Sequence, residues 1–168
     1  GSTRAGLRER SALDARFEKY WLKLSCVERL FTGCRWAEGP VYFGDGRYLL
    51  FSDIPNNELK QWTRAGGVTT LRKPSHNANG NTLDLAGRLL TCEHSGRRVA
   101  VQEKDGTVKT LVDSFESRKF NSPNDVVVRS DGSVGAKQTI SVSRYSVRGR
   151  IQTSGTGASS EITAVTTI

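Results

Sequence analysis

Arg35-Trp-Ala-Glu-Gly-Pro-Val-Tyr42 opens a pattern that returns twice more along this 168-residue chain. Three glycines mark the repeat, each eight residues after an oxygen-bearing side chain: Gly46 after Glu38, Gly87 after Asn79, and Gly132 after Asn124. Setting these glycines in register places three oxygen donors at the same point of consecutive repeats. Self-similarity at a long period is the signature of a repeat architecture.

Short runs of β-forming residues fill the chain from Cys26 to Ser133 and alternate with turns rich in glycine and aspartate. We expect strands over residues 27–32, 39–43, 48–52, 59–63, 68–72, 81–84, 88–93, 99–102, 108–112 and 124–129. Corresponding runs lie 40 or 41 residues apart. Four strands in each repeat predict the blades of a β-propeller, because a β-sandwich would lack this long period. The predicted fold is therefore all-β, with two blades and the start of a third.

The two ends of the chain depart from this pattern. Apolar residues spaced at three or four predict a short amphipathic helix over residues 12–24, capped by Ser11 or Asp14 and packed on the domain. Residues 134–168 hold twelve Ser or Thr in 35 positions, so we expect an irregular, disordered tail. The chain is thus divided into a basic segment with a short helix (1–25), a partial propeller (26–133) and a tail (134–168).

Most of the net charge of +8 comes from the ends of the chain. Residues 1–25 carry six Lys or Arg against three acids, and residues 134–168 carry four against one. The blades show no stripe of cations interleaved with aromatic residues, so we expect no nucleic-acid partner. No 18-residue apolar run or signal-peptide pattern is present, which predicts no membrane association. Three cysteines without CxxC spacing favour a reducing compartment, and we expect a cytoplasmic protein.

The repeat points to a site at one end of the blades. The innermost strands of a propeller converge on a central channel, where Glu38, Asn79 and Asn124 would form part of a ring. One carboxylate and two amide oxygens suit a divalent cation such as calcium, which takes roughly six to eight oxygen ligands. The alternative is that each asparagine only builds a turn at the start of a strand.

Glu93-His94 lies one strand beyond Asn79 and offers an acid and a possible base. The alternative is that His94, like His76 in its Ser/Asn-rich loop, is a solvated loop residue. The chain has no Gly-x-Ser-x-Gly elbow, phosphate-binding loop or dinucleotide fingerprint.

Five motifs, in order within the stretch from Ser11 to Ser133, resemble the gluconolactonases, of the superfamily of senescence marker protein 30 and luciferin-regenerating enzyme. They are Trp36-Ala-Glu-Gly-Pro-Val-Tyr42, Tyr48-Leu-Leu-Phe-Ser-Asp-Ile-Pro55, Asn79-Gly-Asn-Thr-Leu-Asp84, Thr91-Cys-Glu-His94 and Asn121-Ser-Pro-Asn-Asp-Val-Val-Val128. The resemblance implies a six-bladed propeller, truncated here. It also implies a divalent cation in the channel (calcium, with zinc or magnesium as alternatives) and hydrolysis of sugar lactones to aldonic acids.

The resemblance also implies roles for single residues. Glu38 and Asn124 match the family's metal-ligand positions. Four residues match positions that line the substrate pocket: Asn79, Asn81, Glu93 and His94. The family's base aspartate and a further channel asparagine have no counterpart, so no catalytic residue is assigned, and we expect the isolated chain to be inactive.

The resemblance ends at Val134, where the family continues with Trp and this chain gives Gly135. Reading the codons in another frame permits family-like residues beyond this point, so a frame slip is one explanation of the tail. Two alternatives to a lactonase stay open. The blades could be a binding module that self-associates through exposed blade faces, or the channel could hydrolyse phosphotriesters.

Overall fold

The computed structural model describes residues 14–20, 28–139, 148–153 and 160–165, and the chain divides into two units, Gly1–Gly33 and Cys34–Ile168. In the first unit, η1 is a 3-10 helix over Ala15–Tyr20, which lies within the helix that we predicted over 12–24. Residues 12–13 and 21–24 lie outside the described residues. Asp14 caps it as predicted, because its carboxylate accepts a hydrogen bond from the amide of Arg16 at 2.8 Å. Ser11 lies outside the described residues, and the packing of the helix on the domain stays a prediction. Among the described residues, no helix has the length and apolar composition needed to span a membrane.

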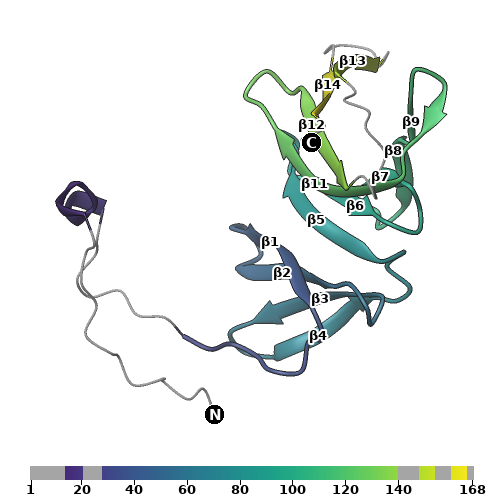
Figure 1. The fold of residues 1–168 in the computed structure, drawn as a ribbon. Coiled ribbons are helices and arrows are strands. Elements are labelled where there is room, and N and C mark those ends of the chain that lie inside the picture. The colour runs from purple at the N-terminus through teal and green to yellow at the C-terminus, as the bar shows by residue number, and fades with distance from the viewer. Residues whose placement is uncertain (1–13, 21–27, 140–147, 154–159, 166–168) are drawn as a thin grey trace. The chain divides into compact units, whose positions relative to one another are not determined.

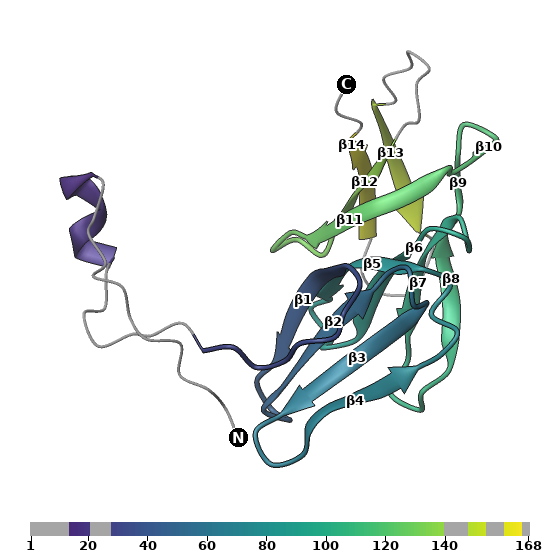
Figure 2. The ribbon, with the colours of Figure 1, turned by 60° about the horizontal axis from the view of Figure 1, so that its bottom comes forward.

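The second unit consists of strands, nearly all of them paired antiparallel, in repeated four-stranded sheets, which we call blades (Figures 1 and 2). Blade 1 contains β1 (Ala37–Phe43), β2 (Tyr48–Asp53), β3 (Glu58–Thr63) and β4 (Gly67–Arg72). Blade 2 contains β5 (Ala78–Leu83), β6 (Leu89–Glu93), β7 (Arg98–Gln102) and β8 (Val108–Val112). In both blades the spatial order of the strands follows the chain. The two predicted blades and nine of the ten predicted strands are confirmed within the described residues.

Residues 28–32 form no strand, so the predicted strand over Val27–Thr32 is wrong for these residues. The segment has the apolar composition of a strand, but composition alone does not form one without pairing to another strand. A short hairpin that we did not predict, β9 (Ser114–Phe115) and β10 (Arg118–Lys119), follows blade 2.

Blade 3 is more complete than we predicted. It contains β11 (Ser122–Val128), β12 (Val134–Thr139), β13 (Arg148–Thr153) and β14 (Ser160–Val165), in the spatial order β11-β12-β14-β13. The expectation of an irregular chain after Val134 is therefore wrong for these segments. The free edge of β11 supplies hydrogen-bonding groups for β12, and the Ser/Thr-rich composition does not prevent strand pairing. Unlike in blades 1 and 2, one pair of neighbours, β12 and β14, is parallel.

The turn that joins the first two strands fixes the register of each blade. Its closing residue has a left-handed backbone and donates its amide hydrogen across the turn: Arg47 to Gly44, Gly87 to Asp84, and Gly132 to Arg129. Arg47 (φ 52°), and not Gly46, is therefore the counterpart of Gly87 (φ 75°). The glycine register that we predicted is off by one in blade 1, because this blade has one more residue between Glu38 and its turn.

The blades pack face against face. Leu50 and Leu59 of blade 1 pack on Leu89 of blade 2. The larger cluster joins blade 2 to blade 3 and contains Leu90, Cys92, Val99, Val101, Val112, Phe120, Val126, Val134 and Ala136. Cys92 is free and buried in this cluster, and burial raises the pKa of its thiol. Cys92 therefore packs in the core as a small apolar side chain.

Two glycines let the innermost strands β1, β5 and β11 approach closely. A Cβ on Gly39 (φ 57°) would lie 2.1 Å from the carbonyl oxygen of Asn79. A Cβ on Gly80 would lie 2.7 Å from both the carbonyl oxygen of Asn124 and the Cα of Asp125. Each is a contact with rigid backbone, so no side chain fits without moving a strand.

We therefore expect Gly80→Ala to lower the free energy of unfolding by about 1–3 kcal/mol, the usual cost of overpacking. The measurement is the midpoint of urea unfolding followed by circular dichroism. Gly44→Ala is the matched control, because a Cβ at Gly44 meets nothing within 4 Å. Equal midpoints for the two variants would contradict the close approach of β5 and β11.

Candidate functional site

The three oxygen donors of the sequence repeat occupy equivalent positions in the three blades. Six residues after each turn-closing residue come Asp53, Glu93 and Gln138, which pair with Ala37, Ala78 and Pro123 respectively. The next residues in the innermost strands are Glu38, Asn79 and Asn124. The alignment of these three positions is confirmed.

A β-bulge lies at each of these positions. The strand register shifts between Glu38 and Val41 in β1, between Ala78 and Asn81 in β5, and between Pro123 and Asp125 in β11. A bulge adds a residue on one strand and turns a side chain away from the regular alternation, which is why bulges are common beside functional sites. The same end of all three innermost strands is thus irregular in the same way.

Glu38 and Asn124 are the predicted cation ligands. Glu38 is solvent-exposed, and its Oε1 accepts a hydrogen bond from the indole nitrogen of Trp36 at 3.1 Å. Asn124 is half-buried. Their oxygens are of the type that calcium prefers, but two protein donors fall well short of the roughly six to eight that it takes. No group of three His, Cys, Asp or Glu side chains gathers within the described ranges. These residues alone therefore do not make a calcium site.

Asn79 and His94 form a pair at the second position. The Nδ2 of Asn79 lies 3.0 Å from the Nε2 of His94. Because an amide nitrogen only donates, the imidazole accepts at Nε2 and is the neutral tautomer. Burial lowers the pKa of His94 below 6.5, which favours the same neutral form. His94 is therefore half-buried and held by a neighbour, whereas His76 is exposed.

Asn81 serves the interface between blades 1 and 2. Its Nδ2 lies 2.9 Å from the Gly39 carbonyl oxygen, 2.8 Å from the Ser52 Oγ and 2.9 Å from the Asn79 carbonyl oxygen. Its Oδ1 accepts a hydrogen bond from Thr91 at 2.9 Å. The side chain is only 7% exposed, and protein groups occupy both of its ends. This network leaves Asn81 no free donor for a substrate, and its predicted pocket role stays untested.

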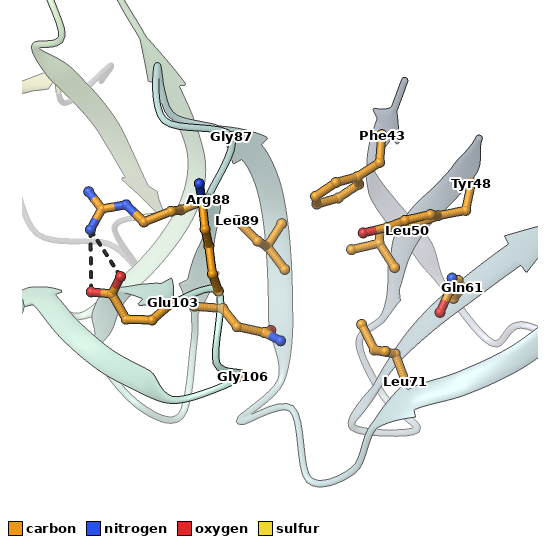
Figure 3. A pocket seen from close by; sticks show the side chains of 12 residues that line it. Phe43, Tyr48, Leu50, Gln61, Leu71, Gly87, Arg88, Leu89, Glu103 and Gly106 are labelled. Atoms are coloured by element: carbon orange, nitrogen blue, oxygen red, sulfur yellow. Dashed lines mark hydrogen bonds and ion pairs between the residues drawn. The ribbon is translucent and has the colours of Figure 1, made fainter. Parts of the chain in front are cut away.

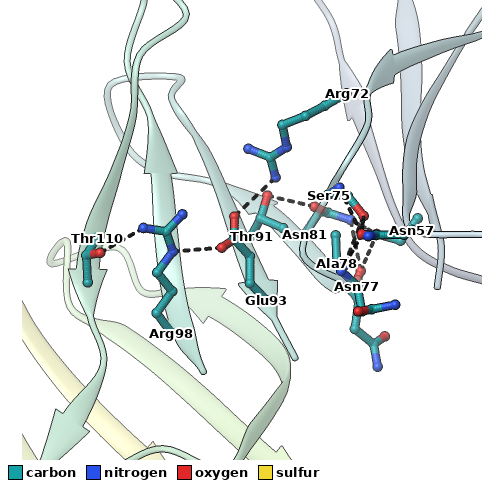
Figure 4. A network of polar contacts seen from close by, with 12 residues as sticks. Asn57, Arg72, Ser75, Asn77, Ala78, Asn81, Thr91, Glu93, Arg98 and Thr110 are labelled. Atoms are coloured by element: carbon teal, nitrogen blue, oxygen red, sulfur yellow. Dashed lines mark hydrogen bonds and ion pairs between the residues drawn. The ribbon is translucent and has the colours of Figure 1, made fainter. Parts of the chain in front are cut away.

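Glu93 is fully buried between two arginines (Figure 4). Its Oε2 accepts from the Nε of Arg98 at 2.7 Å, and its Oε1 lies 3.5 Å from the Nη2 of Arg72. Arg98 also donates to Thr110 at 2.9 Å. Since Arg72 belongs to β4 and Glu93 to β6, the cluster joins blade 1 to blade 2. The contacts of Glu93 in this structure link the two blades, and its predicted contact with substrate stays a prediction.

A family model described as the SMP-30/gluconolactonase/LRE-like region matches residues 36–154. The chain belongs to this family. The match runs past Val134, where we expected the resemblance to end. The gluconolactonase of Zymomonas mobilis is 32% identical over 64% of this chain and 34% of its own length.

Solved structures agree with the family assignment. One protein assigned as a gluconolactonase is 41% identical with a TM-score of 0.60, over 63% of this chain and 37% of its own. The Xanthomonas campestris gluconolactonase is 33% identical with a TM-score of 0.61, over 64% and 36%. A virginiamycin B lyase from Staphylococcus aureus, at 18% identity and a TM-score of 0.51, shares the fold alone, over 67% of this chain and 39% of its own. The chain spans about a third of the length of its SMP-30/gluconolactonase relatives, and its blades correspond to part of a propeller.

Sequence reasoning missed the residues that hold this SMP-30/gluconolactonase fragment together around the site. Ser52, Thr91, Arg72 and Arg98 lie on strands whose pairing had to be known before their contacts could be inferred. A buried acid at the end of β6 was the available signal, since a buried carboxylate requires a partner. The sequence does not show which of its 25 Lys and Arg residues supplies that partner.

We expect Glu93→Gln to lower the free energy of unfolding by about 3–5 kcal/mol, because it leaves two guanidinium groups without their buried counter-ion. Urea unfolding provides the measurement. Glu103→Gln is the control, since Glu103 is a more exposed partner of Arg88 and its loss should cost about 1 kcal/mol or less. Native stability in Glu93→Gln would show that the ion cluster is not structural.

We expect His94 to titrate below pH 6.5 in the folded chain, and Asn79→Ala to move its pKa upward by removing a donor to the neutral ring. The neutral ring stabilises folding fully above pH 6.5, and this contribution is lost as the pH falls through the lowered pKa. NMR titration of the imidazole resonances measures both values. A wild-type value above 6.5, or no upward change in the variant, would contradict the pairing.

Proposed function

We propose that this chain is part of a metal-dependent sugar-lactone hydrolase that converts a lactone to an aldonic acid. The observation that carries the proposal is the equivalence of Glu38, Asn79 and Asn124 on adjacent innermost strands, within a chain of the SMP-30/gluconolactonase family. Two relatives that match it are named gluconolactonases. The proposed substrate is a small sugar lactone.

The residues of this chain supply part of such a site. Glu38 and Asn124 would contribute two oxygen ligands to a divalent cation, for which calcium is the first candidate and zinc or magnesium are alternatives. Asn79 donates to the Nε2 of His94, which fixes the orientation of the ring and favours its neutral form with the hydrogen on Nδ1. The ring then offers Nδ1–H as a donor to a substrate, and it serves as a base only when Nε2 is released from Asn79. The remaining ligands and the base aspartate of the family would have to come from beyond the described residues.

The second candidate is a non-catalytic interaction module that binds through an exposed blade face. A cross-strand row of apolar residues on blade 1 favours it: Tyr42, Leu49, Trp62 and Val68 lie opposite one another on β1 to β4. Tyr42 is 55% exposed. Apolar rows of this kind mark interaction sites in soluble proteins.

We expect the purified 168-residue chain to show no turnover of glucono-1,5-lactone above the uncatalysed rate, with or without added calcium, because its ligand set is incomplete. The measurement is the release of acid in a pH-indicator assay, with the chelator EDTA as a control. Light scattering on the same samples reports the oligomeric state. Turnover that EDTA abolishes would contradict the expected inactivity, and Asn124→Ala should then remove it. An inactive chain that forms dimers would instead favour the interaction module.

A further inference from the structure

A cavity of about 380 Å³ lies between blade 1 and blade 2, away from the site at Glu38, Asn79 and Asn124 (Figure 3). Its lining comes from the end of β1, the start of β2, single residues of β3, β4, β6 and β7, and the turns that follow β5 and β7. The candidate functional residues lie instead at the starts of β1, β5 and β11. The volume falls in the range of small-molecule sites, roughly 300–1,000 Å³. The cavity is therefore a second concave surface, at the opposite end of the innermost strands from the candidate functional residues.

The blade 1 wall is mainly apolar and aromatic. Phe43 and Tyr48 stack with their ring centroids 4.5 Å apart and their planes 15° apart. Leu50 and Leu71 extend this wall, and Leu89 faces it from blade 2 (Figure 3). Flat aromatic and aliphatic surfaces of this kind pack against the C–H groups of a ring-shaped ligand.

Neutral hydrogen-bonding groups complete the lining. Gln102 lies in the wall, and its Oε1 is buried without a hydrogen-bond partner among the described residues. A buried acceptor of this kind requires a donor. Gln61 contributes a second amide, and Tyr48 adds a hydroxyl that stays protonated because burial raises its pKa. A ligand with hydroxyl groups would satisfy these partners.

The charged groups at the rim are largely paired with one another. Arg88 donates to Asp84 at 2.7 Å and lies 3.3 Å from Glu103. In Figure 3 its guanidinium turns toward Glu103. Lys109 adds a contact of 3.6 Å to Glu103. The Arg88 and Glu103 charges therefore neutralise each other. Lys104 adds an ammonium group to the lining, which can donate to a hydroxyl. The other polar groups of the wall are neutral, and together they favour an uncharged ligand that carries hydroxyl groups.

We propose that this cavity is a second binding site, for a neutral monosaccharide of the pyranose type. The sugar ring lies against Phe43, Tyr48 and Leu89. The amide of Gln102, whose buried Oε1 has no partner among the described residues, turns toward the cavity and accepts from one of the sugar hydroxyls. The site binds and does not catalyse. It stands independently of the proposed lactonase function, because none of its residues belongs to the ring of Glu38, Asn79 and Asn124.

Saturation-transfer NMR with D-glucose and the full 168-residue chain tests the proposal. Gln102→Leu removes the acceptor, and we expect it to weaken glucose binding by about tenfold, the loss of one buried hydrogen bond. Leu71→Trp fills the cavity and should weaken binding at least as much. Asn124→Ala is the control at the other end of the blades and should leave binding unchanged. Circular dichroism verifies that each variant is folded.

Three results would overturn the proposal. Absence of saturation transfer to the wild-type chain means that the cavity holds water alone. Unchanged transfer in both folded cavity variants means that the sugar binds elsewhere. Loss of transfer in Asn124→Ala alone places the sugar at the candidate lactonase site.

Discussion

The side chain of Asn81 is the contact on which the arrangement of blades 1 and 2 depends. Its amide group lies within hydrogen-bond distance of Gly39 on β1, Ser52 on β2 and Thr91 on β6. A buried amide is costly unless its groups are bonded, so only one relative position of the two sheets satisfies it. The apolar contacts of Leu50, Leu59 and Leu89 are less directional. The polar network therefore sets the relative position of the two blades, and the hydrophobic core stabilises them in that position.

This constraint lies beside the candidate site and limits what the site residues are free to do. Asn79 and Asn81 are two residues apart in β5, yet the carbonyl of Asn79 accepts from Ser52 while its side chain faces His94. The bulge in β5 makes this division possible, because it separates the direction of the side chain from that of the backbone. One short strand therefore serves both the packing of the blades and the candidate chemistry.

The sequence predicted the repeating parts of this molecule well, because the period of glycine-containing turns and β-rich runs reflects strand length directly. The equivalence of Glu38, Asn79 and Asn124 followed from that period. The contacts of Glu93 did not, since they depend on arginines from two other strands. The strands after Val134 were missed because their composition lacks aromatic residues and because β12 pairs with β14, which follows it only after β13. Pairing between segments distant in sequence leaves no local pattern.

The repeat also explains how Glu93 became available for its ion cluster. In blade 1 the equivalent Asp53 accepts hydrogen bonds from the amides of Arg35 and Trp36, which lead into β1. In blade 3 the equivalent Gln138 accepts from the amide of Asn121, which leads into β11.

In blade 2 a different side chain does this work. The Oδ1 of Asn57 accepts from the amides of Ser75 and Asn77, which lead into β5. Asn57 has a left-handed backbone (φ 57°), a conformation that asparagine tolerates better than most residues. Because Asn57 holds the chain at the entry to β5, the carboxylate of Glu93 is free to pair with Arg72 and Arg98. The position that caps the innermost strand in blades 1 and 3 therefore carries, in blade 2, an acid whose ion pairs join neighbouring sheets.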